Sequence, residues 1–184
     1  MSTKSDIMVA FASLLGELPV NSISTQAIFN RAGVSRRTFG RYFSGKEDIV
    51  IAQMKQDFED PIRALLNLMP FEHMDNATKM LYARNFNALQ ANWPYYSAIV
   101  DGWGLPWLIR RYTNIALELE RISVPLADGI TPEEQDFARH FFAGIGGVAL
   151  QRWIESGFCV SAEDLADFVD TWAYGNRRLH LRSR

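Results

Sequence analysis

The segment ISTQAIFNRAGVSRRTFGRYFSGK, residues 23–46, constrains the fold more than any other part of the chain. Ser24 and Ser35 are favourable N-cap residues, because a serine side chain accepts a hydrogen bond from a backbone N–H of the first helical turn. Gly33 stands between them and ends the first helix, since glycine adopts left-handed backbone angles without steric cost. The pattern predicts two short helices joined by a tight turn, over residues 24–32 and 35–42.

The second of these helices has an apolar inner face and a basic outer face. Phe39 and Phe43 lie four residues apart on the inner side, and Val34 is expected to fill the angle between the helices. The outer side carries Arg36, Arg37, Thr38, Arg41 and Tyr42. A basic second helix is what a helix-turn-helix inserts into the major groove of DNA. The segment therefore predicts DNA binding, rather than a merely solvated run of charge.

The distribution of charge agrees with this prediction, although the whole chain has a net charge of −2. Residues 1–55 carry seven basic and four acidic side chains, and the remainder carries 12 basic and 17 acidic ones. Attraction to phosphate needs a local basic face rather than a basic protein. The positive charge is concentrated where the motif lies.

The same residues resemble the DNA-binding end of the tetracycline-repressor (TetR) family of bacterial regulators. The resemblance rests on the turn Ala32 to Ser35, the pair Thr38-Phe39, the run Arg41 to Phe43 and the run Lys46 to Asp48. A preceding N-terminal helix, an all-helical body and a length of 184 residues also suit the family. The resemblance implies a helix-turn-helix DNA-binding domain over residues 1–46 and a helical effector-binding and dimerisation domain over residues 47–184.

The resemblance also implies roles for individual side chains. Arg36 and Gln26 match base-reading positions, and arginine suits guanine O6 and N7 while glutamine suits adenine N6 and N7. Arg37 falls where relatives often have a small residue or proline, and it has the length to reach a base or a phosphate. Phosphate contacts, which fix register without reading sequence, are implied for Thr25, Thr38, Tyr42 and Lys46. The complete set of expected DNA-contacting residues is Thr25, Gln26, Arg36, Arg37, Thr38, Arg41, Tyr42 and Lys46.

Two residues depart from the family pattern. Gly40 replaces an aromatic residue that usually contacts DNA, and it weakens a short helix by about 0.5–1 kcal/mol relative to alanine. Base reading should then depend more on Arg36, Arg37 and Gln26; a weaker or narrower specificity is the alternative. Phe29 replaces a small residue between the two helices, which is expected to shift the recognition helix slightly.

The rest of the chain also reads as helical, and no alternating segment is long enough for a sheet, so the fold class is all-α. A first helix over residues 4–18 should end at Pro19. Ser44 and Glu47 could form a capping box for a fourth helix, which Pro61 should kink or break near Asp60. Further helices are expected over residues 75–91, 94–101, 105–123, 132–157 and 162–178.

The helix expected over residues 132–157 is apolar on two stripes, whereas a surface helix needs only one. The first stripe contains Phe137, Phe141, Gly144 and Val148. The second contains Ala138, Phe142, Ile145, Ala149 and Trp153. Two stripes indicate packing against both the chain's own core and another chain, with Gly144, Gly146 and Gly147 allowing a second backbone to approach. The resemblance implies a homodimer through helices near 132–157 and 162–178; the alternative is that both stripes are intramolecular core.

The middle of the body is rich in aromatic residues, which can line an apolar pocket between helices. By the resemblance, such a pocket would take a small hydrophobic or aromatic effector, whose identity the sequence does not give. The candidate ligand-binding residues are Phe86, Trp93, Trp103, Trp107, Tyr112 and Phe142. Candidate polar partners are Arg84, Asp101 and His140. The alternative is that these aromatic residues simply fill the core.

We therefore interpret the chain as a cytoplasmic, homodimeric transcriptional regulator, most simply a repressor whose release from a double-stranded DNA operator follows effector binding. The main alternative is a helix-turn-helix adaptor without an effector. A small helical enzyme is less well supported: His73, His140 and His180 have no metal-ligand spacing, and no nucleophile motif surrounds a serine or Cys159. Neither a cofactor, a metal nor a catalytic residue is expected. The longest apolar run, residues 141–150, is well short of the roughly 18 residues that suggest a membrane span.

Overall fold

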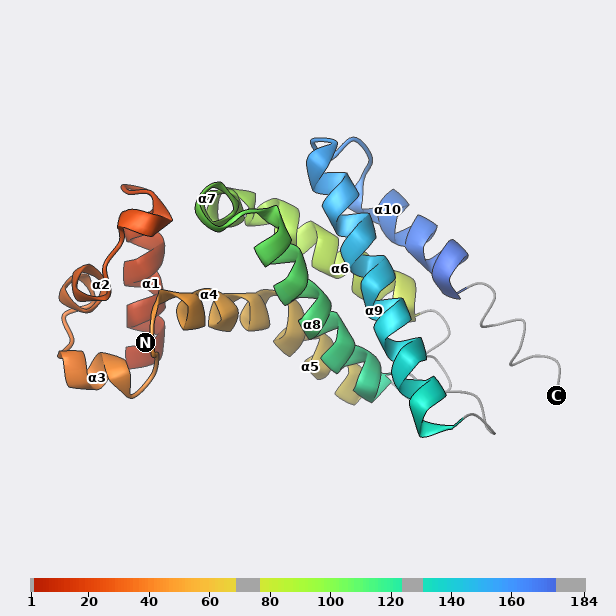
Figure 1. The fold of residues 1–184 in the computed structure, drawn as a ribbon, viewed down its shortest axis with the longest axis horizontal. Helices are drawn as coiled ribbons and strands as arrows, with labels where there is room; N and C mark the ends of the chain where they lie inside the picture. Colours follow the sequence, from red (N-terminus) through yellow and green to blue (C-terminus); the bar gives the residue numbers. More distant parts are fainter. Residues whose placement is uncertain (1, 69–76, 124–130, 175–184) are drawn as a thin grey trace, which may run out of the picture. The chain divides into compact units, whose positions relative to one another are not determined.

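The computed structural model describes residues 2–68, 77–123 and 131–174. Every regular element within these ranges is helical, which confirms the all-α prediction (Figure 1). The first part of the chain contains α1 (Thr3–Leu15), η1 (Val20–Ser22), α2 (Thr25–Arg31), α3 (Arg36–Gly40), α4 (Lys46–Met54), η2 (Lys55–Glu59) and α5 (Asp60–Leu68). The second part contains α6 (Ala77–Ala91), α7 (Trp93–Trp103), α8 (Leu105–Ser123), α9 (Pro132–Glu155), α10 (Ala162–Val169) and η4 (Asp170–Tyr174). Residues 75–76 and 175–178 of the expected helices lie outside the described ranges.

Backbone contacts divide the chain into two compact units. The first comprises Met1–Gln56 and Asn92–Leu108, and the second comprises Asp57–Ala91 and Ile109–Arg184. The expected boundary at residue 46 between a DNA-binding and an effector domain stays a prediction.

The first unit is built around α1. Ile7, Phe11 and Leu14 are buried on one face of this helix, which packs against α2, α4 and α7. The helix ends at Leu15 and not at residue 18, and Leu18 is 42% exposed instead of continuing the apolar stripe. The early end agrees with the effect of Pro19, because the residue before a proline avoids the helical region.

The start of α4 differs from the expected capping box. The helix begins at Lys46, so Gly45 holds the N-cap position and the residue three positions later is Asp48. The backbone N–H of Ser44 donates to Asp48 Oδ2 at 2.8 Å, and the Ser44 hydroxyl donates to the same oxygen. Glu47 instead accepts a hydrogen bond from Trp107 Nε1 at 3.2 Å. The predicted pairing of Ser44 with Glu47 is wrong by one residue of register.

The expected interruption near Asp60 is confirmed. After Met54 the helix continues as one π-helical turn, η2, before α5 begins at Asp60. Pro61 has no N–H to donate to the carbonyl of Asp57, four residues earlier. Arg84 of α6 donates to that carbonyl from Nη1 at 3.2 Å. A side chain therefore supplies a donor that the proline lacks.

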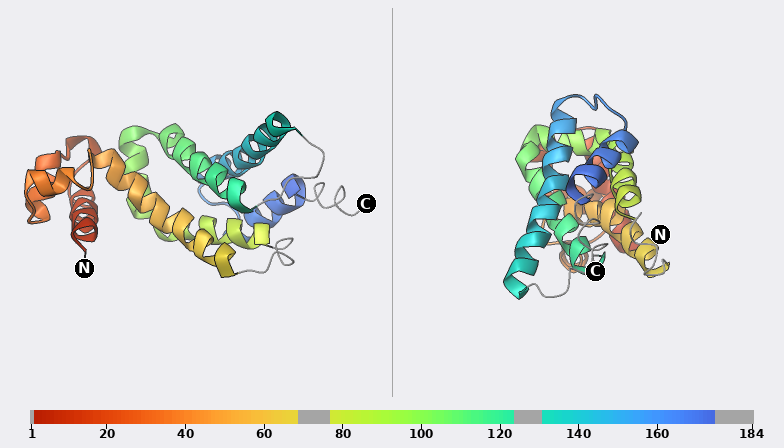
Figure 2. Two further views of the ribbon diagram at one scale, coloured as in Figure 1. Left: turned by 90° about the horizontal axis from the view of Figure 1, so that it is seen from below. Right: turned by 90° about the vertical axis from the view of Figure 1, so that its right-hand side faces the viewer.

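The second unit has an aromatic core between α6, α8 and α9. Phe86 of α6 lies 5.7 Å from the ring of Trp153 of α9, and Phe58 makes an edge contact with Tyr112 of α8 at 5.8 Å. Helix α10 packs along α6 (Figure 2), where Lys79 Nζ lies 2.6 Å from Asp167 Oδ1. The predicted caps of the last two helices are confirmed, since Thr131 forms a capping box with Glu134 and Ser161 accepts from the N–H of Asp164.

Two glycines of α9 have a different role from the one expected. A Cβ on Gly146 would lie 2.7 Å from Cε1 of Tyr82, and one on Gly147 would overlap the side chain of Thr113. Both glycines therefore admit side chains of the chain's own α6 and α8 and are not available to a second backbone. A Cβ on Gly144 would meet no described atom within 4 Å, so this position alone is open.

Candidate functional site

The turn between α2 and α3 has the predicted geometry. Ser24 Oγ accepts from the N–H of Ala27 at 3.1 Å, and Ser35 Oγ accepts from the N–H of Thr38 at 3.0 Å. Gly33 has φ +67°, the left-handed conformation that only glycine adopts without strain. Both N-caps and the glycine turn are therefore confirmed.

Aromatic side chains hold α3 against the rest of the first unit. Phe39 and Phe43 are 4% and 3% exposed, which confirms that both face inward. Phe29 packs between α2 and α3, with its ring centroid 6.3 Å from that of Phe39. Val34 is half-buried at the turn. The inner face of α3 is thereby fixed, so its opposite face must point outward.

The outward face brings together most of the residues expected to contact DNA. Thr25 and Gln26 are exposed at the start of α2, and Arg36, Arg37 and Arg41 are exposed on or just after α3. Tyr42 is 42% exposed. Thr38 is half-buried, and its Oγ1 forms a hydrogen bond with Ser35 Oγ at 2.9 Å. The predicted contacts of these residues with DNA stay predictions.

Helix α3 is shorter than expected. It ends at Gly40, and Arg41 serves as its C-cap, whereas the sequence pattern continued the helix to residue 42. Glycine at the last helical position agrees with the low helix propensity of this residue. A Cβ on Gly40 would meet no described atom within 4 Å. The local packing of the chain therefore does not require glycine here.

Lys46 differs from the other members of the expected set. Its ammonium donates to the carbonyl oxygens of Val20 at 2.6 Å, Asn21 at 3.3 Å and Ile23 at 3.0 Å. Burial lowers the pKa of Lys46, because desolvation disfavours the charged form. The side chain thus lies against the backbone that precedes α2.

A further arginine near the motif joins α1 to α2. The guanidinium of Arg31 donates to both carboxylate oxygens of Glu17 at 2.8 Å and to Ser13 Oγ at 2.7 Å. The hydrogen bond from Arg31 lowers the pKa of Glu17. Sequence reasoning did not identify this pair, because its members are separated by a loop and follow no helical spacing.

The six candidate ligand-binding residues are divided between the two compact units. Trp93, Trp103 and Trp107 belong to the first, where the last two are in contact at 4.7 Å between ring centroids. Phe86 and Tyr112 are buried in the core of the second, and Phe142 is half-buried on α9. Among the candidate polar partners, Asp101 and His140 are exposed on α7 and α9, and Arg84 contacts the carbonyl of Asp57.

A polar pair lies inside the second unit. Tyr112 Oη and Asn85 Oδ1 are buried in neighbouring side chains that interact, although neither atom makes a hydrogen bond of normal geometry with a described residue. Burial raises the pKa of Tyr112, so its hydroxyl is neutral at physiological pH. Asn85 shares the helical spacing of Tyr82, Phe86 and Leu89, the buried stripe of α6, and this spacing is the sequence signal that points to it.

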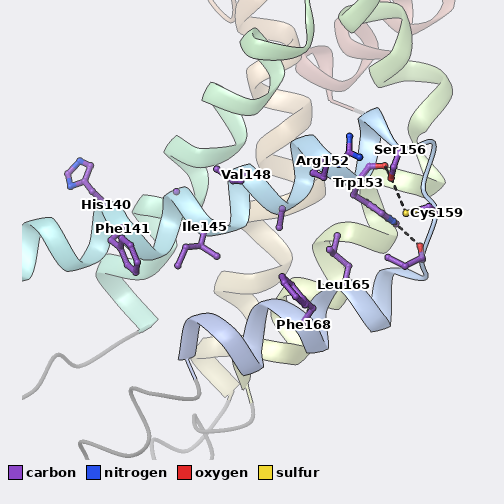
Figure 3. A pocket seen from close by; sticks show the side chains of 13 residues that line it. His140, Phe141, Ile145, Val148, Arg152, Trp153, Ser156, Cys159, Leu165 and Phe168 are labelled. Atoms are coloured by element: carbon purple, nitrogen blue, oxygen red, sulfur yellow. Dashed lines mark hydrogen bonds between the residues drawn. The ribbon is translucent and has the colours of Figure 1, made fainter.

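An apolar groove runs between α9 and α10. It has a volume of about 700 Å³. Phe141 and Ile145 face Leu165 and Phe168 across it (Figure 3). The groove is lined by His140, Phe141, Gly144, Ile145, Val148, Ala149, Arg152, Trp153, Ser156, Cys159, Val160, Leu165 and Phe168.

Large apolar side chains are exposed on this face of the chain. Phe137, Phe141 and Val148 of the first stripe are 78%, 65% and 70% exposed, whereas Trp153 of the second stripe is 2% exposed. Phe168 and Trp172 add exposed aromatic surface at 57% and 72%. The first stripe is therefore not core of the single chain, which contradicts the alternative that both stripes are intramolecular.

In the part of the chain that the structure describes, no group of three or more His, Cys, Asp or Glu side chains could hold a metal ion. His73 and His180 lie outside the described residues. Within those same ranges, no helix combines the length and the apolar character that a membrane crossing needs.

Comparisons with known proteins agree with the geometry of the first unit. The family model for bacterial regulatory proteins of the tetR family matches residues 7–52, which contain most of α1 and the whole helix-turn-helix. A search of curated proteins gave no match.

Solved structures with similar folds extend the likeness over nearly the whole chain. A putative TetR-family transcriptional regulator from Syntrophomonas wolfei has a TM-score of 0.60 at 15% identity, covering 99% of this chain and 96% of its own. A TetR transcriptional regulator from Streptococcus agalactiae has a TM-score of 0.54 at 22% identity, covering 93% of each chain. The dihydroxyacetone kinase operon activator DhaS has a TM-score of 0.59 at 18% identity, covering 96% of this chain and 97% of its own.

Proposed function

We propose that the chain is a transcriptional regulator of the TetR family, whose model its helix-turn-helix matches over residues 7–52, and that it represses transcription from a DNA operator and leaves that operator when a small-molecule effector binds. Its task is binding rather than catalysis, and its place of action is the cytoplasm, where the DNA is. The proposal has three parts: reading of DNA by α3, dimerisation through α9 and α10, and an effector site in the helical body.

The observation that carries the proposal is the exposed basic face of a capped α3. Arg36 lies in the first turn of the helix, the end that a helix-turn-helix directs toward the base edges. A bidentate contact from arginine to guanine provides about 1–3 kcal/mol of discrimination. Gln26 is exposed at the start of α2 and would read a second base. Thr25, Thr38 and Tyr42 would set the register on the phosphates.

The groove between α9 and α10 supports the homodimer. Helices α9 and α10 and the following η4 leave Phe137, Phe141, Val148, Phe168 and Trp172 exposed, and these side chains would be buried if the same elements of a second copy packed against them. Such an isologous four-helix contact would give the dimer a two-fold axis. Its recognition helices would then enter successive major grooves, about 34–36 Å apart, over a partly palindromic operator.

The buried pair in the second unit supports an effector site. Tyr112, whose ring contacts Phe58, and its neighbour Asn85 offer a neutral hydroxyl and an amide oxygen that make no hydrogen bond of normal geometry with a described residue, and such buried polar atoms are costly unless something binds them. An apolar effector with one hydroxyl or carbonyl group would supply that partner. An adaptor without an effector is the remaining alternative. In that case a bound water would be the hydrogen-bond partner of Tyr112 and Asn85.

Selection of duplexes from a random DNA library tests the first part directly. The wild type should enrich a partly palindromic site, and Arg36→Ala should lose the preference at one base of each half-site while retaining weak binding. Absence of enrichment by the wild type, even at low salt where phosphate contacts are strongest, would contradict operator reading. A promoter fusion containing the selected site then gives the sign of regulation, which the similarity to an operon activator makes worth measuring.

A further inference from the structure

Lys46 has an unusual position for a residue expected to hold a DNA phosphate. A lysine ammonium has three protons and no acceptor. Three hydrogen bonds, of 2.6, 3.3 and 3.0 Å, connect Nζ to the carbonyl oxygens of Val20, Asn21 and Ile23. The whole donor capacity of the ammonium is therefore satisfied by the chain's own backbone.

These three carbonyls belong to the segment that leads into the helix-turn-helix. Val20 and Asn21 are in η1, and Ile23 immediately precedes Ser24, the N-cap of α2. Lys46 is the first residue of α4. Its side chain consequently ties the start of α4 to the start of α2, which carries Gln26.

The same segment is held from its other side by α7. Asn21 Nδ2 donates to the carbonyl of Gly102 at 3.0 Å. Val20 is fully buried, and its side chain occupies the place where a Cβ on residue 102 would lie. The segment is thus clamped between α4 and α7, and Lys46 contributes the charged half of the clamp.

We propose that Lys46 is a positioning residue for base reading, which holds η1 and the start of α2 in register and makes no contact with a DNA phosphate. The inference rests on the proposed operator binding and refines it. The desolvation that lowers the pKa of Lys46 agrees with an ammonium that lies against these carbonyls.

Salt dependence separates the two roles. Each phosphate contact contributes about 0.9 to the slope of log K against log [salt], so a dimer that loses two such contacts loses about two from its slope. Lys46→Met should weaken operator binding at every salt concentration and leave the slope nearly unchanged. Arg41→Met is the matched control, because it removes one exposed positive charge from the same motif and should lower the slope.

Base discrimination separates positioning from a general loss of stability. Lys46→Met should reduce the ratio of operator to non-operator affinity by roughly tenfold, because a misplaced α2 loses part of a base contact. A mere loss of folded protein would lower both affinities equally and leave the ratio unchanged. Lys46→Arg keeps the charge, but a planar guanidinium cannot direct its protons to three converging carbonyls. The proposal expects this variant to remain impaired.

Hydrogen exchange of the DNA-free protein gives a readout that does not depend on the operator. Lys46→Met should accelerate exchange of the amides of Ile23 and Ala27 by roughly tenfold, since the clamp that restrains local opening is lost. Unchanged exchange, a slope lowered by about two, or full rescue by Lys46→Arg would overturn the proposal. If the wild type fails to select an operator, the proposed function fails, whereas the exchange experiment still decides whether Lys46 restrains η1.

Discussion

Truncation of Phe141 tests the proposed dimer, because the apolar area that this side chain would bury can be worked out from its exposure. This side chain is 65% exposed in the single chain and lines the groove between α9 and α10. A phenylalanine that can bury roughly 200 Å² therefore has about 130 Å² left to bury in a dimer, worth about 3 kcal/mol at 25 cal/mol per Å². A two-fold dimer contains two copies, for about 6 kcal/mol.

The measurable effect should be about half of that sum, because association also costs ordering of side chains and imperfect packing. Phe141→Ala is thus expected to make the free energy of dimerisation less favourable by about 3 kcal/mol, which raises the dimer dissociation constant roughly 100-fold. Sedimentation velocity over a range of protein concentrations measures the constant directly. Leu68→Ala is the matched control, since Leu68 is 82% exposed on α5 and does not line the groove.

Two results would refute the reasoning. The wild type could sediment as a monomer even at about 100 μM, where a dissociation constant in the micromolar range would give mostly dimer. Alternatively, Phe141→Ala could shift the constant no more than Leu68→Ala does. Circular dichroism of each variant checks that the helical fold is retained.

Three further predictions concern local packing and charge. Gly146→Ala should lower the free energy of unfolding by about 1–3 kcal/mol through overlap with the ring of Tyr82. Gly144→Ala, which meets open space, should instead raise it by up to about 1 kcal/mol; denaturant unfolding distinguishes the pair, and equal destabilisation would contradict the packing argument. Gly40→Ala should extend α3 and raise the melting temperature slightly, as it gains about 0.5–1 kcal/mol of helix propensity without a clash; a lower melting temperature would mean that glycine is required. The lowered pKa of Glu17 makes its hydrogen-bonded carboxylate stabilising above the ordinary pKa of 4.5, and this contribution is lost as pH falls through the folded-state value. Glu17→Gln should therefore reduce the fall in the free energy of unfolding when the pH drops below 4.5. A pH dependence identical to that of the wild type would show that the Glu17 carboxylate does not contribute to it.

The elements that sequence reasoning located best are those whose signals are local. Ser24 and Ser35 cap backbone N–H groups of the adjacent helical turn, and Gly33 sets the backbone angles of the turn between the helices. The structure reproduces all three. The start of α4 shows how small an error defeats such a signal, because moving the N-cap from Ser44 to Gly45 changes which carboxylate is three residues away.

Features that depend on the facing surface could not be read in the same way. Periodicity identified two apolar stripes on α9, but only packing against α6 and α8 decides which stripe is buried. Gly146 and Gly147 look like surface glycines in the sequence until Tyr82 and Thr113 are placed beside them. The three carbonyls around Lys46 lie more than twenty residues before it, so no spacing rule points to them.

Pro61 lies two residues after η2, the π-helical turn that follows α4. Because Pro61 has no backbone N–H, the segment around η2 cannot form an unbroken series of α-helical hydrogen bonds. Arg84 of α6 donates a hydrogen bond to the carbonyl of Asp57, so a side chain of α6 takes part in the hydrogen bonding of the break. Displacement of α6 would stretch or break this hydrogen bond, so the Arg84 side chain couples the position of α6 to the backbone at the interruption.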